Sequence, residues 1–262
     1  MIRLCSASIG ENDFSDVFGA TLDPGIAAQA IGAAGNYRAD FNAVLKQMLK
    51  VGFSLRDLSA IEVPVLSTGK LFYRAEVAGG VAASDYISVT SGTDLCMVVP
   101  QGISWSAGGH AQLSVLMHFL STDGAAAPVT IGTANGDLTG ISNVYVADLD
   151  CVESININFG YELRFCQDGK LYPQDVFVVG QRPSMTIVTS DQAQVTTGNV
   201  APGTVSALVA DFAKVAEGGV RGAVRRYSLT GHVTRSVSGD RPGLVTLSCQ
   251  GKGGFTVTDP VV

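Results

Sequence analysis

The sequence predicts a mainly β protein, either a β-sandwich or a barrel-like sheet, with one or two helices packed on it. Three observations lead to this fold class. Apolar and polar residues alternate over most of the chain, which is the period of a half-buried strand. Glycine is abundant, at 31 of 262 residues, and is spread without a period, as many tight turns require. Few segments have helical spacing, and repeated strand–helix–strand units are absent from the pattern.

The two predicted helices lie near 38–51 and near 204–216. In the first, apolar residues recur at helical spacing from Phe41 to Leu49, and Gly52 follows as a stop signal. In the second, a similar apolar stripe runs from Val205 to Val215. The Ala-rich stretch 24–36 fits a helix, a loop or an arm, and the sequence does not decide among them.

Strands are predicted along most of the rest of the chain. In HAQLSVLMHFL, residues 110–120, the apolar residues Leu113 to Phe119 fall on one face at every second position. A turn, STDG, follows, so we expect APVTIGT at 127–133 to run back and pair with this strand. A second half-buried strand is predicted at 152–159, with further strands over 176–191 and after residue 225.

The stretch ELRFCQDGKLYP, residues 162–173, resembles either a reactive cysteine site or the bend of a hairpin. A reactive cysteine needs a helix N-terminus or a fixed cation to lower its thiol pKa. Cys166 instead ends a predicted strand and lies near the negative Asp168. Asp168 and Gly169 between alternating residues are a strong signal for a hairpin turn, with Lys170 facing solvent. We therefore predict a structural hairpin.

The composition and charge pattern favour a self-associating globular protein. Hydrophobic residues make up 46% of the chain and charged residues 15%, which excludes a disordered chain and suits a surface partly covered by subunit contacts. The net charge of -6 divides unevenly, because the residues from Lys214 onward carry seven basic and three acidic side chains. An acidic front part and a basic tail favour head-to-tail association.

No metal or cofactor site is predicted. His110 and His118 would lie about 26 Å apart on a strand at ~3.3 Å per residue, too far to share one ion. His232 is remote from both in the sequence. The five cysteines lie far apart, with no CxxC pair, so reduced and mostly buried thiols are expected. Phosphate-binding glycine loops and a serine-hydrolase elbow are also missing from the sequence.

Asp148 and Asp150 are the best candidates for catalysis, and they are weak ones. On one strand face they would lie about 7 Å apart, roughly the spacing of the two carboxylates of an inverting glycosidase. However, no aromatic platform for a sugar flanks them, and the tryptophan, Trp105, lies far away in the sequence. We predict no catalytic residue and no enzyme. A carbohydrate-active or carbohydrate-binding β-sandwich remains an alternative.

The order of predicted elements over residues 95–257 resembles the tail-tube, or major tail, proteins of long-tailed bacteriophages. The similarity lies in the strand VESININFGYELRF, the turn CQDG, KLYP, the strand QDVFVVG and then RPSMTIVTSD. GISWSAGGHAQLSVLMHFLSTDGAAAPVTI is similar to the strand pair that precedes these elements, and the helix at 204–216 has a counterpart. The resemblance implies a tail-tube-like β domain over 91–262 and an N-terminal arm or loop region over 1–90.

The resemblance also implies a function. Subunits of this family form hexameric rings that stack head to tail into a hollow tube, which conducts DNA. The expected partners are further copies of the chain, other tail proteins and DNA in non-specific transit, with no membrane, since no apolar run is long enough to span one. The expected location is the virion tail, after assembly in the host cytoplasm, with an acidic bore that repels DNA. A baseplate or adaptor ring protein of the same virion is the related alternative.

Overall fold

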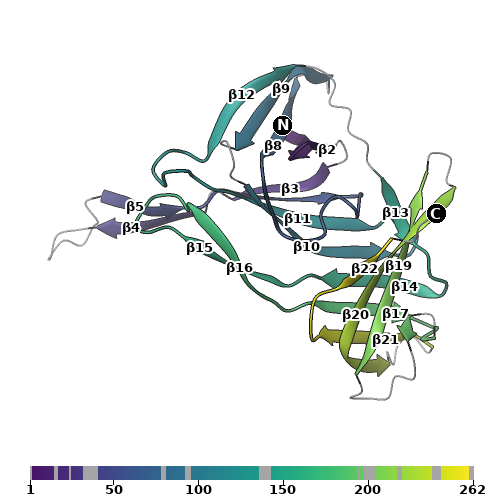
Figure 1. Ribbon diagram of the computed structural model, residues 1–262. Helices are drawn as coiled ribbons and strands as arrows, with labels where there is room; N and C mark the ends of the chain where they lie inside the picture. The colour runs from purple at the N-terminus through teal and green to yellow at the C-terminus, as the bar shows by residue number, and fades with distance from the viewer. Residues whose placement is uncertain are drawn as a thin grey trace.

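The computed structural model describes residues 2–14, 17–23, 25–31, 41–77, 81–91, 96–135, 143–193, 195–197, 205–216, 220–237 and 243–259. Within these ranges the protein consists of antiparallel β-sheets joined by turns (Figure 1), so the mainly β prediction is confirmed. The sheets are open and do not close into a barrel. The same ranges contain no helix, and thus none long and apolar enough to cross a membrane.

The large sheet has a long path of strands, with three short strands paired at its margins. Its spatial order is β13 (Val144–Ala147), β19 (Val205–Val215), β20 (Arg221–Val237), β21 (Val245–Gly251), β17 (Ser184–Thr189), β14 (Val152–Asn158), β10 (Cys96–Ser106), β11 (Gln112–Phe119), β6 (Lys50–Leu55) and β3 (Val17–Asp23). The short strands are β18 (Thr196–Thr197) beside β19, β22 (Thr256–Thr258) beside β20, and β7 (Val65–Ser67) beside β10.

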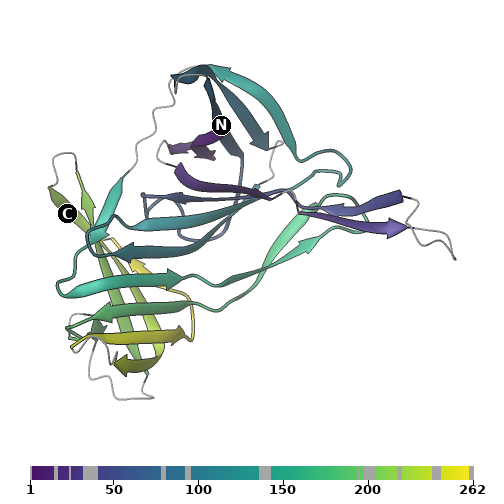
Figure 2. The same cartoon turned by 180° about the vertical axis from the view of Figure 1, so that it is seen from behind.

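A smaller sheet and two separate hairpins complete the fold. The smaller sheet has the order β12 (Val129–Asn135), β9 (Val81–Ser91), β8 (Gly69–Val77), β1 (Ile2–Ile9) and β2 (Asn12–Phe14). The hairpins are β4 (Ile26–Ile31) with β5 (Phe41–Gln47), and β15 (Tyr161–Cys166) with β16 (Asp175–Gln181). Both extend toward the same side of the molecule (Figures 1 and 2). They meet where the Gln47 amide donates to the Leu171 carbonyl at 2.8 Å.

One hydrophobic cluster joins the two larger sheets. It includes Leu4 and Leu71 from the smaller sheet together with inward-facing residues of the large one. On β11, Leu113, Val115, Met117 and Phe119 are all buried, as their alternation predicts. Strands from the first 90 residues lie in the same sheets as later strands, since β6 pairs with β11 and β9 with β12.

The predicted helix near 204–216 is wrong, because residues 205–215 form the strand β19, which lies between β13 and β20 in the large sheet. Leu208, Ala210 and Phe212 face the core, and the alternate residues Val209 and Asp211 are buried on the other face. A strand covered on both faces is apolar at almost every position, so a helical stripe can be drawn through it as easily as a strand. Pairing with β20 along nearly all of its length decides the outcome.

The predicted helix near 38–51 is also wrong in the described residues, which form β5 and the start of β6. Residues 38–40 lie outside the described ranges. β5 pairs with β4, which belongs to the undecided Ala-rich stretch. In β6, Val51, Phe53 and Leu55 are buried at every second position, a strand signal that continues through Gly52.

The predicted pairing of 127–133 with the strand before it is wrong. β12 pairs with β9 instead, because β10 and β6 already occupy the two edges of β11. The connecting loop turns away, and its Gly124 carbonyl accepts a hydrogen bond from the Tyr172 amide at 2.9 Å. Local alternation identified the strand but carried no information about its partner.

The predicted hairpin at residues 162–173 is confirmed. Asp168 and Gly169 have φ angles of 39° and 73°, as the two central residues of a type I′ turn require. The Lys170 amide closes the turn on the Gln167 carbonyl at 2.6 Å. β16 begins at Asp175, so a short loop separates the turn from the returning strand. Cys166 is half-buried at the end of β15.

Candidate functional site: a buried arginine clamp

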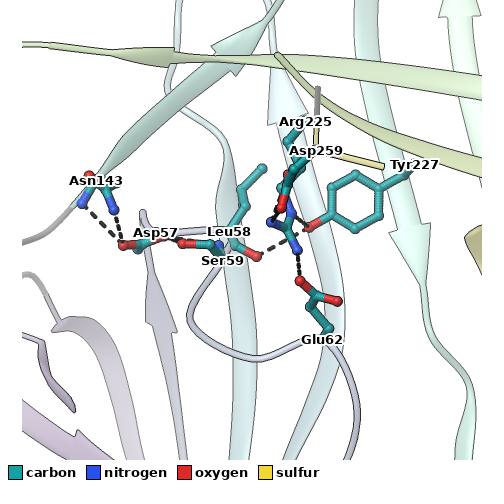
Figure 3. Close-up of polar contacts among 8 residues, drawn as sticks. All are labelled: Asp57, Leu58, Ser59, Glu62, Asn143, Arg225, Tyr227 and Asp259. Atoms are coloured by element: carbon teal, nitrogen blue, oxygen red, sulfur yellow. Dashed lines mark hydrogen bonds and ion pairs between the residues drawn. The ribbon is translucent and has the colours of Figure 1, made fainter. Parts of the chain in front are cut away.

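The loop 56–64, which follows β6, is fastened to strands that come much later in the chain (Figure 3). Its contacts centre on Arg225 of β20, whose side chain is 3% exposed. Arg225 alternates with Val224 and Arg226 along the strand, and its position in the core-facing register directs it inward. We call this group the arginine clamp; its members are Leu58, Glu62, Arg225, Tyr227 and Asp259.

Arg225 uses all three nitrogens of its guanidinium group. Nη1 donates to both carboxylate oxygens of Asp259, at 2.9 and 2.7 Å, and Nη2 donates to a carboxylate oxygen of Glu62. Nε donates to the Tyr227 hydroxyl oxygen at 2.9 Å, and the Tyr227 hydroxyl donates to the Leu58 carbonyl at 3.2 Å. These bonds tie together the loop, β20 and the residue that follows β22.

The electrostatics keep the arginine charged. Burial alone opposes the positive charge, but Tyr227 and Glu62 outweigh this effect, so the pKa of Arg225 is raised above its ordinary value. Burial also raises the pKa of Tyr227 to about 12, against the opposing influence of Arg225. The clamp therefore consists of a permanent cation, two carboxylates and a neutral phenol at physiological pH.

A second anchor holds the start of the same loop. Asp57 is buried, and its Oδ1 accepts hydrogen bonds from the Ser59 amide at 2.9 Å and the Ser59 hydroxyl at 2.5 Å. Its Oδ2 accepts from the Asn143 side chain at 2.8 Å, next to the start of β13. A buried carboxylate is tolerated when its lone pairs are filled in this way.

The clamp and its anchor are built for holding rather than for catalysis. Their carboxylates are engaged by hydrogen-bond donors, and the eight residues of Figure 3 include no histidine, lysine or cysteine. The Ser59 hydroxyl donates a hydrogen bond to Asp57, and the same carboxylate also accepts from the Ser59 amide and the Asn143 side chain. Sequence reasoning missed these residues. The available signal for the clamp was an arginine at a position of the strand that alternation predicts to be buried. Its carboxylate partners lie far away in the sequence.

The histidines considered from the sequence are not brought together. His110 lies in the turn before β11, His118 is buried within β11, and His232 is exposed on β20. Across the described part of the chain, no group of three or more histidine, cysteine or acidic side chains is placed to hold a metal ion.

Asp148 lines a cavity that Asp150, its proposed catalytic partner, does not line. Asp148 accepts a hydrogen bond from Arg221 at 2.9 Å and lines a cavity of about 490 Å³ together with Asp211 and Arg226. Asp150 is not among the lining residues. Asp211 is in turn held by Arg226, through bonds of 2.8 and 2.6 Å. Each carboxylate in the cavity therefore has an arginine partner.

These ion pairs also change the meaning of the basic tail. Arg221, Arg225 and Arg226 are three of its seven basic residues, and all three pair with carboxylates of the same chain. Their charge is compensated internally and contributes little to a long-range field. Much of the positive charge predicted for the tail is therefore paired within the chain itself.

The four cysteines whose side chains the structure describes are free thiols in different surroundings. Cys96 and Cys249 are buried, Cys166 is half-buried and Cys151 is exposed. Burial raises the thiol pKa of Cys96 and of Cys249, which makes both less reactive. The expectation of mostly buried thiols thus holds for two of the four.

No protein-family model matches the chain, and no curated protein matches it. Its function is therefore inferred from its own fold and surfaces.

Proposed function

We propose that the chain is a structural virion protein, the ring-forming subunit of a bacteriophage tail tube that conducts DNA. In this proposal hexameric rings stack head to tail, other tail proteins bind at the tube ends, and DNA passes transiently without specific binding. The subunit assembles in the host cytoplasm, resides in the virion tail, contacts no membrane and is not an enzyme. The open, strand-rich architecture and the resemblance in the order of the strands from β14 to β17 support the proposal, whereas the helix expected at 204–216 is the strand β19.

The observation that carries the proposal is the free edge of β16. Among the described strands, β16 pairs with β15 alone, which leaves its other edge without a partner strand. Phe177, Val178 and Val179 follow one another on it and are 54%, 45% and 58% exposed. The charged residue of the strand, Asp175, stands at its first position. An apolar strand edge is a ready template for pairing with another chain, and monomeric proteins normally protect such edges. A sheet that continues from subunit to subunit would cover it.

A second edge has the same character. β12 is the outermost strand of the smaller sheet, and its Ile131 is the most exposed of the large apolar residues that the structure describes. Its sequence, VTIGTAN, contains no charge and no proline. Two different strand edges that lack a partner strand on one subunit support heterologous contacts, which close into rings or extend into fibres.

The polar face of the large sheet supports a role in conducting DNA. A row of uncharged residues crosses six neighbouring strands, each one paired with the next: Thr234, Ser248, Thr186, Asn156, Ser104 and Gln112. Non-specific DNA binding depends on lysine and arginine neutralising phosphates, and this row has neither. Facing the bore, it would form a neutral wall that does not retain DNA, in place of the acidic wall expected from the sequence.

The alternatives have weaker support. A baseplate or adaptor ring protein would use the same strand edges, so its distinction from a tube subunit depends on its position in the virion. A carbohydrate-active β-sandwich would need a free acid and base. In the 490 Å³ cavity, Asp148 and Asp211 are both held by arginines.

The first test is assembly as a function of concentration. The purified protein is examined by negative-stain electron microscopy and light scattering, alongside the variants Val178→Lys and Val237→Lys. Wild-type protein is expected to form rings or tubes. Val178→Lys places a charge on the free edge and should abolish them. Val237 is similarly exposed, at 62%, but lies on a strand paired with β21, so Val237→Lys should assemble normally.

The possible outcomes test the proposed function and the proposed interface at β16 separately. A wild-type protein that stays monomeric at every concentration contradicts the tail-tube proposal. If Val178→Lys assembles as well as wild type, the ring proposal stands, but β16 is not part of the ring interface.

A further inference from the structure

A small pocket lies beside the arginine clamp, at the point where β14 passes into β15 and β16 passes into β17. Its volume is about 240 Å³. Three aromatic residues line it: Phe159, Tyr161 and Phe255. They come from the end of β14, the start of β15 and the segment before β22, so the pocket exists only in the folded chain. We call it the aromatic pocket.

The three rings form a packed aromatic wall. The Phe159 ring centroid lies 6.3 Å from that of Tyr161, at an interplanar angle of 18°, and 5.4 Å from that of Phe255, at 75°. Phe159 is fully buried, whereas Tyr161 and Phe255 are half-buried and reach the surface. Mutually packed rings hold their positions, so their negative π faces and edges are presented without reorganisation.

The polar groups of the pocket are Glu62 and Gln181. Gln181 is the register partner of Tyr161 across the β15–β16 pair. Glu62 belongs both to the pocket lining and to the clamp, and its side chain is 47% exposed.

The charges around the pocket leave an excess of negative charge. In the clamp, Arg225 supplies one positive charge against the two carboxylates of Glu62 and Asp259. The nearby pair of Arg182 and Glu162 is neutral as a whole. Lys252 is exposed in the turn before Gly254 and is not among the lining residues.

We propose that the aromatic pocket is a binding site for an alkylammonium group on an aliphatic stem. Aromatic faces attract such cations, and the stem replaces water along the apolar wall. The excess carboxylate charge favours a cation over a neutral group and opposes an anion. A free primary amine and a lysine side chain of another protein chain share this chemistry. The site goes beyond the tail-tube proposal and does not depend on it.

The test is a titration followed by nuclear magnetic resonance of the full chain. The probes are n-butylammonium, the capped peptide acetyl-Gly-Lys-Gly-amide, and the neutral analogue in which norleucine replaces lysine. The charged probes should shift the ring resonances of Phe159, Tyr161 and Phe255. Their affinity should exceed that of the norleucine peptide by about two- to thirtyfold, the range expected for a cation–aromatic contact.

Variants identify the residues responsible. Phe255→Leu keeps an apolar wall but removes a ring, and should weaken the lysine peptide by about two- to fivefold. Glu62→Gln removes the excess charge and should also weaken it, while leaving the norleucine peptide unchanged. Phe18→Leu changes a half-buried ring on β3, outside the pocket, and should bind like wild type. Thermal melting of each variant confirms that it is folded.

The results decide whether the pocket binds an alkylammonium group and whether that group belongs to a protein lysine or to a free amine. Equal binding of the lysine and norleucine peptides, or no shift of the three rings with either charged probe, overturns the proposal. If binding is confirmed, tighter binding of the peptide indicates a protein lysine, and tighter binding of n-butylammonium indicates a free amine. All of these titrations are carried out in the Val178→Lys background, which is expected to stay unassembled, so their result is independent of ring formation.

Discussion

The arginine clamp and the β15–β16 hairpin use the same ion-pair chemistry in opposite surroundings. Arg225 of the clamp is 3% exposed and is held by Glu62, Asp259 and Tyr227. Arg182, at the end of the hairpin, is 83% exposed and pairs with Glu162 at 2.8 Å. The first arrangement fixes three distant segments, whereas the second is a solvated surface pair. The protein thus has a centre fixed by buried ion pairs and a hairpin whose outer side is exposed.

The apolar residues of the two regions differ in the same way. Phe159 and Phe212 of the large sheet are fully buried within the chain, but Phe177 of the hairpin is not. A small hydrophobic cluster packs the hairpin against the rest of the chain. It is formed by Val176 of the hairpin together with Met97, Val99 and Leu120. The other side of the hairpin remains apolar and exposed. A subunit that completes its own core but leaves one hairpin uncovered is suited to assembly with other chains.

The largest expected effect is a difference in stability between variants of the two ion pairs. Replacing Glu62 and Asp259 together by alanine leaves the buried Arg225 without a countercharge, and should lower the free energy of unfolding by about 3–5 kcal/mol. Glu162→Ala breaks the exposed pair and should cost less than about 1 kcal/mol. Urea denaturation, followed by circular dichroism, measures both. Similar losses in the two variants would mean that the clamp is no more than a surface ion pair.

The next effect concerns the attachment of the hairpin to the large sheet. His118 of β11 is 4% exposed, and its ring lies 4.8 Å from that of Phe165 in the hairpin. Its Nδ1 has no hydrogen-bond partner among the residues that the structure describes. Burial, with a smaller contribution from Lys50, lowers the pKa of His118 to about 4 from its ordinary value of 6.5. The unfolded chain therefore takes up a proton at a higher pH than the folded one. Stability is fully present above pH 6.5 and is lost as the pH falls toward 4.

The loss should reach about 3 kcal/mol at most, since each pKa unit corresponds to 1.36 kcal/mol. It is measured by urea denaturation at pH 7, 5.5 and 4.5. His118→Phe removes the titrating group and should flatten the dependence over this range, whereas His110→Gln, at an exposed turn, should not. An unchanged slope in His118→Phe would assign the pH dependence to other groups.

The same contrast explains how much the sequence could predict. Strands with one covered face were predicted well, because Leu113 to Phe119 alternate and Asp168–Gly169 specifies its own turn. β19 was mistaken for a helix because both of its faces are covered, which removes the alternation. The partners of β12 and of Arg225 depend on which distant edges and carboxylates the fold brings together, and no local pattern encodes them.

The smallest expected effect tests the turn of the hairpin alone. Gly169 has a φ angle of 73°, and a Cβ atom added there would meet no neighbour within 4 Å. Gly169→Ala should therefore cost only the strain of the left-handed backbone, about 1–2 kcal/mol, without any steric clash. Gly169→Asn should cost less, because asparagine adopts this conformation more readily. Urea denaturation compares the two. If alanine is tolerated as well as asparagine, the turn can relax without disturbing the docked part of the hairpin, and its geometry does not control the free edge of β16.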